Sequence, residues 1–153
     1  MDLIRAMRDV KDAELVLAGG VGDAAYARKC RAAAKGLPVE FVGYLQDVRP
    51  LLRSSCVLAV PSKEALSMAA LEGMAEGVPV VSLDRGGIRD VVLDGKTGFL
   101  IPAHRMGAAL KRLLDDPVLR RRMGRAGRER IREHFRPEAV ASALAGVYRR
   151  VRA

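Results

Sequence analysis

Two acidic residues, Glu64 and Glu72, stand eight positions apart around an expected helix start. Ser67 is a suitable N-cap and Gly77 is a suitable stop, so a helix is expected from Ser67 to Glu76. Glu64 then falls in the loop before this helix. Glu72 falls inside the helix, more than one turn from its start.

The carboxylate of Glu72 has no basic neighbour at helical spacing. Such a group on a small, apolar helix is costly to bury unless a ligand donates hydrogen bonds to it. Its two oxygens suit adjacent sugar hydroxyls, and the free N–H groups of the helix start suit a diphosphate. The alternative, that both glutamates are solvated surface residues, stays open. The helical neighbours of Glu72 are Met68, Ala69, Ala75 and Glu76.

Two glycine turns follow expected strands upstream. Gly19, Gly20 and Gly22 come after an apolar segment and before a helix, and such glycines let a ligand approach the backbone. Gly43 and Tyr44 end the next strand, at the carboxyl edge where ligands bind in open α/β sheets. A tight strand-to-helix turn explains the first glycines equally well, and Tyr44 is equally compatible with a partly buried loop aromatic.

Further glycines stand downstream of the two glutamates. Gly86 and Gly87 precede another short helix, where backbone N–H groups are suited to an anion. Residues 96–98, Lys-Thr-Gly, resemble a turn, and Asp94 with Gly95 favours a simple turn as well.

Short apolar strands alternate with helical stretches, which favours a parallel sheet covered on both faces. The expected fold class is α/β, a doubly wound, Rossmann-like parallel sheet with a helical C-terminal segment. The expected strands are Glu14 to Ala18, Val39 to Val42, Cys56 to Val60, Pro79 to Ser82 and Phe99 to Ile101. The expected helices are Leu3 to Val10, Ala24 to Lys35, Val48 to Arg53, Ser67 to Glu76, Ile88 to Leu93, His104 to Leu114, Pro117 to Gly124, a short segment to Phe135, and Pro137 to Val151.

The chain has 153 residues, the length of one domain, and half of them are hydrophobic. Cys30 and Cys56 lie in apolar segments without CxxC or Cys/His pairing, so we expect two buried, reduced thiols and no zinc site. No apolar run approaches the roughly 20 residues that a membrane span needs. A cytoplasmic location is the default expectation.

The net charge of +9 lies entirely in residues 103–153, a basic helical tail with 14 Lys/Arg and 5 Asp/Glu. Such a tail could contact an anionic membrane surface at the inner face of the membrane, or nucleic acid. Its arginines at helical spacing, interspersed with Glu129 and Glu133, also describe a solvated helix face. No aromatic residues alternate with the arginines to stack bases, so nucleic acid is the less favoured partner.

Six motifs in order along the chain resemble the C-terminal donor domain of group 1 retaining glycosyltransferases, which is one half of the GT-B architecture. The family pattern has a glycine-rich turn, a phenylalanine-x-glycine strand end, a proline-serine followed by two glutamates, a Gly-Gly pair and a Thr-Gly-Phe. The matches here are Ala18-Gly19-Gly20, Phe41-Val42-Gly43-Tyr44, Pro61-Ser62-Lys63-Glu64, Glu72, Gly86-Gly87-Ile88 and Thr97-Gly98-Phe99.

The resemblance implies a role for each matched segment. Glu64 would approach the donor sugar and the reacting centre, and Glu72 would hold the ribose hydroxyls of a nucleotide. Leu66, Ser67 and Met68 would cradle the diphosphate. The loop of Gly43, Tyr44 and Leu45 would border the base, and Gly19 and Gly20 would line the donor site. No metal or other cofactor is implied, and the sequence has no Asp-x-Asp motif.

The implied function is transfer of a hexose, with retention, from a nucleotide diphosphate sugar to a saccharide or lipid-linked acceptor. Ala65-Leu66-Ser67 departs from the Gly-Phe-Gly that usually follows the first glutamate, which puts donor affinity or donor choice in question. The first strand and the acceptor domain of the family have no counterpart in these residues. A separate subunit or a missing domain is therefore an expected partner.

The absent strand belongs centrally in the sheet, between the Glu14 and Cys56 strands. The chain is therefore expected either to close that gap or to be marginally stable. Two alternatives remain. One is the half-domain of a nucleotide-sugar epimerase, and the other is a noncatalytic α/β module whose basic tail binds nucleic acid or membrane.

Overall fold

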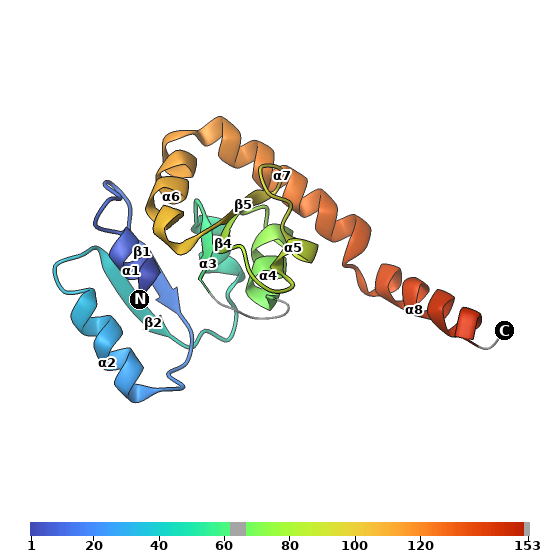
Figure 1. Cartoon of the computed structure of the whole chain (residues 1–153), viewed down its shortest axis with the longest axis horizontal. Helices are drawn as coiled ribbons and strands as arrows, with labels where there is room; N and C mark the ends of the chain where they lie inside the picture. Colours follow the sequence, from blue (N-terminus) through green and yellow to red (C-terminus); the bar gives the residue numbers. More distant parts are fainter. Residues whose placement is uncertain (62–66, 152–153) are drawn as a thin grey trace.

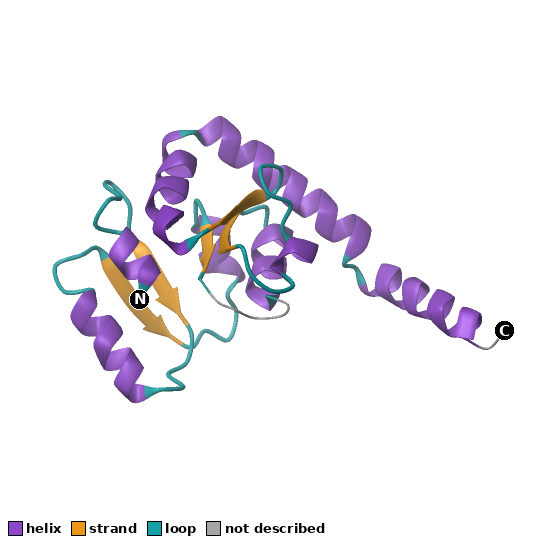
Figure 2. Ribbon diagram, viewed as in Figure 1, coloured by secondary structure: helices purple, strands orange, loops and turns teal. Residues whose placement is uncertain are grey.

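The computed structural model describes residues 1–61 and 67–151, and its strands form two parallel sheets. In the first sheet, β1 (Leu15–Ala18) pairs with β2 (Val39–Gly43). In the second, β4 (Val80–Leu83) lies between β3 (Leu58–Val60) and β5 (Gly98–Ile101). Figure 2 shows the two sheets and the helices around them. The expected α/β fold with parallel strands is confirmed.

Helices connect the strands in the expected order. Before Pro102 they are α1 (Asp2–Ala6), α2 (Ala24–Ala33), α3 (Arg49–Ser54), α4 (Met68–Ala75) and α5 (Ile88–Val91). A 3₁₀ turn, η1 (Ala103–Arg105), then leads into α6 (Met106–Asp115), α7 (Pro117–His134) and α8 (Pro137–Val151). The two helices expected between Pro117 and Phe135 are a single helix, α7, because Gly124 and Gly127 continue the helix where it packs closely on its neighbours.

Buried side chains form a core on each side of the second sheet. On one side, α1 and α6 pack over both sheets and bury side chains such as Met106 and Leu113. On the other side, α4 and α5 cover β3 and β4 and bury Met74 and Val91. Helix α2 closes the first sheet around Cys30. Figure 1 shows α6 and α7 wrapping over the second sheet.

The two sheets do not join into the single doubly wound sheet that the sequence predicts. Among the described residues β1 has β2 as its strand neighbour, and β3 has β4 as its own. A cavity of about 590 Å³, lined by residues of β1 and β3 and by the helices around them, separates these two strands. The expected gap beside β1 and β3 therefore stays open in this fold.

Three arginines of α7 hold this helix against its neighbours by donating to backbone carbonyls. Arg120 donates to the carbonyls of Leu113 and Leu114, at 2.7 and 2.5 Å. Arg128 reaches the end of α4, and Arg130 reaches the end of α5. These arginines satisfy carbonyls that helix ends leave open. They are structural groups rather than members of a solvated helix face alone.

Helix α8 runs away from the rest of the molecule and carries no buried residue (Figure 1). Within residues 1–61 and 67–151, no helix is both long and apolar enough to cross a membrane. The expectation of two buried thiols is wrong for Cys56. Cys30 is buried, whereas Cys56 is exposed because β3 begins only at Leu58 and leaves Cys56 in the lining of the cavity.

Candidate functional site

Helix α4 begins where its local sequence predicts. Ser67 is the N-cap, in extended conformation, and its buried Oγ accepts a hydrogen bond from the N–H of Ala70 at 3.3 Å. The helix ends at Ala75 with Glu76 as its C-cap, and Gly77 follows with φ of 78°, the left-handed conformation that glycine adopts readily. The start of α4 therefore presents free backbone N–H groups at a defined position.

Two close backbone approaches fix α4 in place. A Cβ atom on Gly73 would lie 2.5 Å from a methyl carbon of Leu58 in β3, so the helix lies close against the sheet. A Cβ on Gly124 of α7 would lie 1.9 Å from the carbonyl oxygen of Gly77, at the end of α4. Arg128 of α7 donates to the carbonyls of Ala75 at 3.1 Å and Glu76 at 2.6 Å. Helix α4 thus rests on β3 on one side and on α7 at its end.

An ion pair also ties the end of α4 to α3. Arg53 donates to the carboxylate of Glu76 through Nε at 2.8 Å, and this hydrogen bond holds the pKa of Glu76 below its ordinary value. Arg49 likewise lowers the pKa of Asp47 to about 2 by donating to that carboxylate through its side chain and its backbone N–H. Both acids are ionised at neutral pH, and they contact α3 from the end of α4 and from the loop before α3, respectively.

Glu72 is exposed and lies on α4 beside Ala69, where both residues line the cavity. Glu72 therefore carries no cost of burial, contrary to the expectation from its apolar helix, because its side chain is in contact with solvent. The described residues provide no hydrogen bond or ion pair to its carboxylate. An exposed carboxylate can accept hydrogen bonds from a ligand through both oxygens, and the exposure of Glu72 is also compatible with a solvated surface glutamate.

The two glycine turns lie together. The N–H of Gly19 donates to the carbonyl of Gly43 at 2.7 Å, which joins the ends of β1 and β2. Gly19 has φ of 145° and Gly43 has φ of 74°, so both positions favour glycine by conformation. Gly20 is different, because its φ is not positive and a Cβ there would meet nothing within 4 Å. The space beside Gly20 is open.

Tyr44 follows Gly43 and is 78% exposed, so it is not the partly buried loop aromatic that the sequence left open. Leu45 is half-buried next to it. Among the described residues no hydrogen bond links this loop or Gly19 and Gly20 to α4. The structure therefore groups the predicted residues in two sets, the glycine turns and the start of α4.

Two predicted site residues, Glu64 and Leu66, lie outside the described residues. Ser67, Met68 and Glu72 lie on one element, with Ser67 buried and Met68 60% exposed. Groups of His, Cys, Asp or Glu that could hold a metal ion do not occur within 1–61 and 67–151.

The Thr-Gly-Phe motif has a structural role in this fold. The Oγ1 of buried Thr97 accepts from the N–H of Leu93 at 2.9 Å, and Asp94 accepts from the N–H of Leu100 at 2.9 Å. A Cβ on Gly98 would lie 2.0 Å from the carbonyl oxygen of Val80, so β5 requires glycine there. The turns expected around Gly95 and Lys96 are confirmed.

Sequence reasoning missed the support that α7 gives to α4. Arg128 and Gly124 lie about fifty residues after α4, and the arginines of the tail suggested only a charged surface. One signal was present in the sequence. Glycines inside a helical pattern cost stability and therefore often indicate close packing, and Gly124 and Gly127 are such glycines.

The parallel strands, the covering helices and the glycine turns at strand ends define a Rossmann-like α/β domain of the kind found in GT-B glycosyltransferases. Over 98% of the chain, the structure matches a sucrose-phosphate synthase from Thermosynechococcus elongatus, with a TM-score of 0.87 and 32% identity, and covers 41% of that protein. It also matches Anabaena HepE in complex with UDP and glucose, with a TM-score of 0.85 and 19% identity over 95% of the chain and 44% of that protein.

Residues 1–116 match the family described as "Glycosyl transferases group 1". The chain belongs to this family of enzymes. A curated relative, the alpha-maltose-1-phosphate synthase of Mycolicibacterium smegmatis, is 33% identical over 97% of the chain. The chain spans 43% of that relative and 21% of another, a D-inositol 3-phosphate glycosyltransferase of Streptomyces avermitilis. It is therefore less than half as long as these relatives.

Proposed function

We propose that the chain is the donor-binding part of a glycosyltransferase and binds a nucleotide diphosphate sugar between the glycine turns and the start of α4. The family assignment favours a glycosyltransferase over the epimerase and the noncatalytic module. The assignment to this site rests on Glu72, an exposed carboxylate without a protein partner among the described residues. It lies on α4, a helix that β3 and α7 hold in place from two sides.

Each described part of the site has a separate task in this proposal. The carboxylate of Glu72 accepts hydrogen bonds from the ribose hydroxyls, which match its two oxygens. The N–H groups at Ser67 and Met68 and the positive end of the α4 dipole stabilise the diphosphate, which is the leaving group. The loop of Gly43, the exposed Tyr44 and Leu45 borders the base, and the open backbone at Gly20 admits the ligand.

The structure of HepE supports this choice of ligand, because that protein has the same fold and its structure is a complex with UDP and glucose. We infer that Glu64, which lies outside the described residues, approaches the donor sugar, and that the hexose is transferred with retention. A saccharide or lipid-linked acceptor would be held by a second domain or subunit, because donor and acceptor must be positioned together. We assign the chain to the cytoplasm, where nucleotide sugars serve as donors.

Calorimetric titration with UDP, GDP and ADP tests the proposal. We expect one of the three to bind, and Glu72→Ala to weaken that nucleotide about tenfold or more, since hydrogen bonds to a charged group contribute about 1.5–3 kcal/mol. Glu40→Ala is the matched control, because Glu40 is exposed in β2 and has no part in the site. If none of the nucleotides binds, or if both variants bind equally well, the donor site is assigned wrongly.

A further inference from the structure

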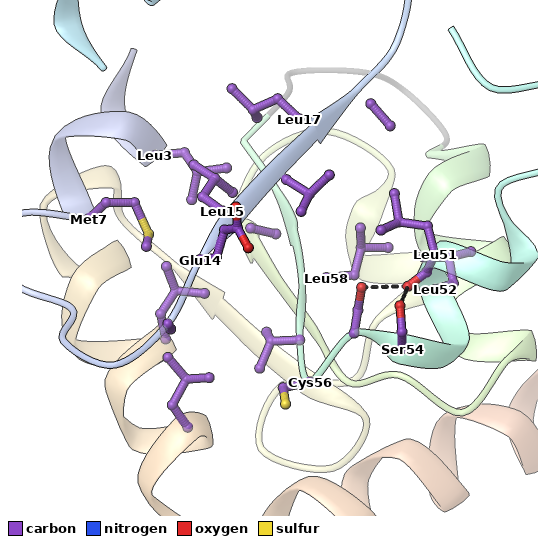
Figure 3. Close-up of a pocket in the computed structure, with 18 of the residues that line it drawn as sticks. Leu3, Met7, Glu14, Leu15, Leu17, Leu51, Leu52, Ser54, Cys56 and Leu58 are labelled. Atoms are coloured by element: carbon purple, nitrogen blue, oxygen red, sulfur yellow. Dashed lines mark hydrogen bonds between the residues drawn. The ribbon is translucent and has the colours of Figure 1, made fainter. Parts of the chain in front are cut away.

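Two cavities in the structure differ in the charge of their lining. The larger one, between β1 and β3, is lined by the acids Asp12, Glu14 and Glu72, and Figure 3 shows Glu14 on its wall. Among the described residues that line it, none is a lysine or an arginine. The smaller one, about 180 Å³ in volume, lies between β5 and α6. We call it the arginine pocket, and it is lined by Phe99, Ile101, Arg105, Ala108, Ala109 and Arg112.

The guanidinium of Arg112 is held over an aromatic ring. Its Cζ lies 5.0 Å from the centre of the Phe99 ring. This cation–π contact restrains the side chain and needs no hydrogen-bond acceptor. Arg130 lies over Phe135 in a similar way, but it also donates to two carbonyls at the end of α5. Within residues 1–61 and 67–151, no acceptor takes a hydrogen bond from Arg112, so its N–H groups are available to a ligand.

Arg105 brings a second positive charge to the same pocket. It is the N-cap residue of α6 and lies seven positions before Arg112, which is about 10 Å along the helix axis. Both side chains are exposed and long enough to reach one group between them. The next acid along the chain, Asp115, pairs with Lys111 at 2.6 Å. In the part of the chain that the structure describes, no carboxylate neutralises the two arginines of the pocket.

The remaining walls of the arginine pocket are apolar and small. Phe99 and Ile101 of β5 are half-buried, and Ala108 and Ala109 of α6 leave space between the helix and the strand. Apolar walls around charges of one sign focus the electric field and concentrate counter-ions. The volume is below the roughly 300–1,000 Å³ of pockets that enclose a drug-sized ligand. The pocket therefore suits one small anionic group.

We propose that the arginine pocket binds the phosphate group of a small, soluble phosphomonoester, whose first carbon atoms lie against Phe99 and Ile101. The phosphate oxygens accept from the guanidiniums of Arg105 and Arg112, which suit phosphate geometry. Two positive charges match the charge of about −1.5 to −2 that such an ester carries at neutral pH. A carboxylate or a phosphodiester has a single charge. The pocket shares no lining residue with the cavity at Glu72, so this proposal does not rest on the donor site.

The surroundings of the pocket favour a soluble ligand over a lipid headgroup. Binding at a membrane surface requires apolar side chains that enter the bilayer beside the basic groups. None of the large apolar side chains that the described residues expose lies on β5, η1 or α6. The pocket therefore has the charge for a phosphate but no adjoining apolar surface for a bilayer.

Titration of the whole chain with phenyl phosphate tests the proposal. The side-chain Nε–H signals of arginines in NMR spectra report binding directly, and variants assign the signals. We expect the signals of Arg105 and Arg112 to shift with a saturable dependence on concentration. Phenyl sulfate has the same shape and one negative charge less, and it should bind at least tenfold more weakly at equal ionic strength, because its hydrogen bonds carry less charge.

Substitutions at exposed positions identify the place of binding. Arg112→Gln and Arg105→Gln should each weaken phenyl phosphate at least tenfold, because each removes charge-assisted hydrogen bonds. Arg121→Gln is the matched control, since Arg121 is an exposed arginine of α7 outside the pocket, and it should change the affinity less than twofold. Ala108→Glu keeps both arginines, adds a carboxylate to the pocket and should abolish binding. Melting temperatures show that the variants are folded.

Four results overturn the proposal. The first is the absence of saturable binding, and the second is equal binding of phenyl phosphate and phenyl sulfate, which would indicate an unspecific basic surface. The third is a loss in Arg121→Gln as large as that in Arg112→Gln. The fourth is binding only to phosphatidylcholine vesicles that contain phosphatidic acid, which would make a lipid headgroup the ligand. Shifts of the Ser67 and Met68 amides without a shift at Arg112 would likewise contradict it, because the phosphate would then bind at the start of α4.

Discussion

The contact between α7 and α4 predicts a strong effect of one added methyl group, in Gly124→Ala. The new Cβ would lie 1.9 Å from the carbonyl oxygen of Gly77, where real contacts are no closer than 3.0 Å. Backbone cannot rotate away as a side chain can, so α7 must move from α4 by about 1 Å. This movement also loosens the hydrogen bonds from Arg128 to the end of α4.

The expected cost of Gly124→Ala is about 1–3 kcal/mol, typical of overpacking, and it outweighs the gain of up to about 1 kcal/mol from the better helix propensity of alanine. For a chain of this size the melting temperature falls by about 2–10 °C. Differential scanning calorimetry and urea unfolding measure both quantities. Nucleotide affinity should fall as well, because α7 supports the helix that carries Glu72.

Two other glycines provide graded controls for this prediction. A Cβ on Gly127 would lie 3.3 Å from the flexible side chain of Met74, so Gly127→Ala should cost less than Gly124→Ala. A Cβ on Gly146 in α8 would meet nothing within 4 Å, so Gly146→Ala should leave stability unchanged or raise it slightly. If Gly124→Ala is as stable as Gly146→Ala, α7 does not support α4 as described.

Two further predictions concern a cap and the response to pH. Ser67→Ala should lower the free energy of unfolding by about 1 kcal/mol, because Ala70 loses its acceptor, and Ser67→Asp should retain most of it in urea unfolding. Arg89 donates to the carboxylate of Asp84 and lowers its pKa, as Arg49 and Arg53 do for Asp47 and Glu76. These acids therefore stabilise the fold above their unfolded pKa values, and that stability should be lost as the pH falls from about 4.5 to about 2. Arg49→Ala should make the loss smaller in urea unfolding at a series of pH values, and an unchanged slope would mean that the Asp47 pair adds no stability.

The type and order of the elements could be predicted from the sequence, because each depends on local signals. The cap at Ser67, the left-handed Gly77 and the short apolar strands all lie where such signals place them. The gap between the two sheets was expected only from the family resemblance, and local sequence does not predict it. Strand pairing depends on which strand edges meet in space. The residues of Leu15–Ala18 and Leu58–Val60 do not by themselves indicate which strand lies beside each edge.

Only those parts of the candidate site that depend on local sequence could be predicted. Glycine conformation at Gly19 and Gly43 follows from local sequence, and the hydrogen bond between them follows once β1 and β2 pair. The exposure of Glu72 depends on its neighbours in space. The same is true of Arg128, whose partners Ala75 and Glu76 are 53 and 52 residues away in sequence.

In the proposed donor site, the carboxylate of Glu72 binds the ribose hydroxyls of a nucleoside diphosphate. A double-mutant cycle tests it most directly, with dissociation constants for the bound nucleotide and its 2′,3′-dideoxy analogue measured for the wild type and for Glu72→Gln. Removal of the hydroxyls should weaken binding to the wild type about tenfold or more and should matter much less in the variant, a coupling of about 1–2 kcal/mol. Equal losses in both proteins, with no coupling, would show that Glu72 does not contact the ribose.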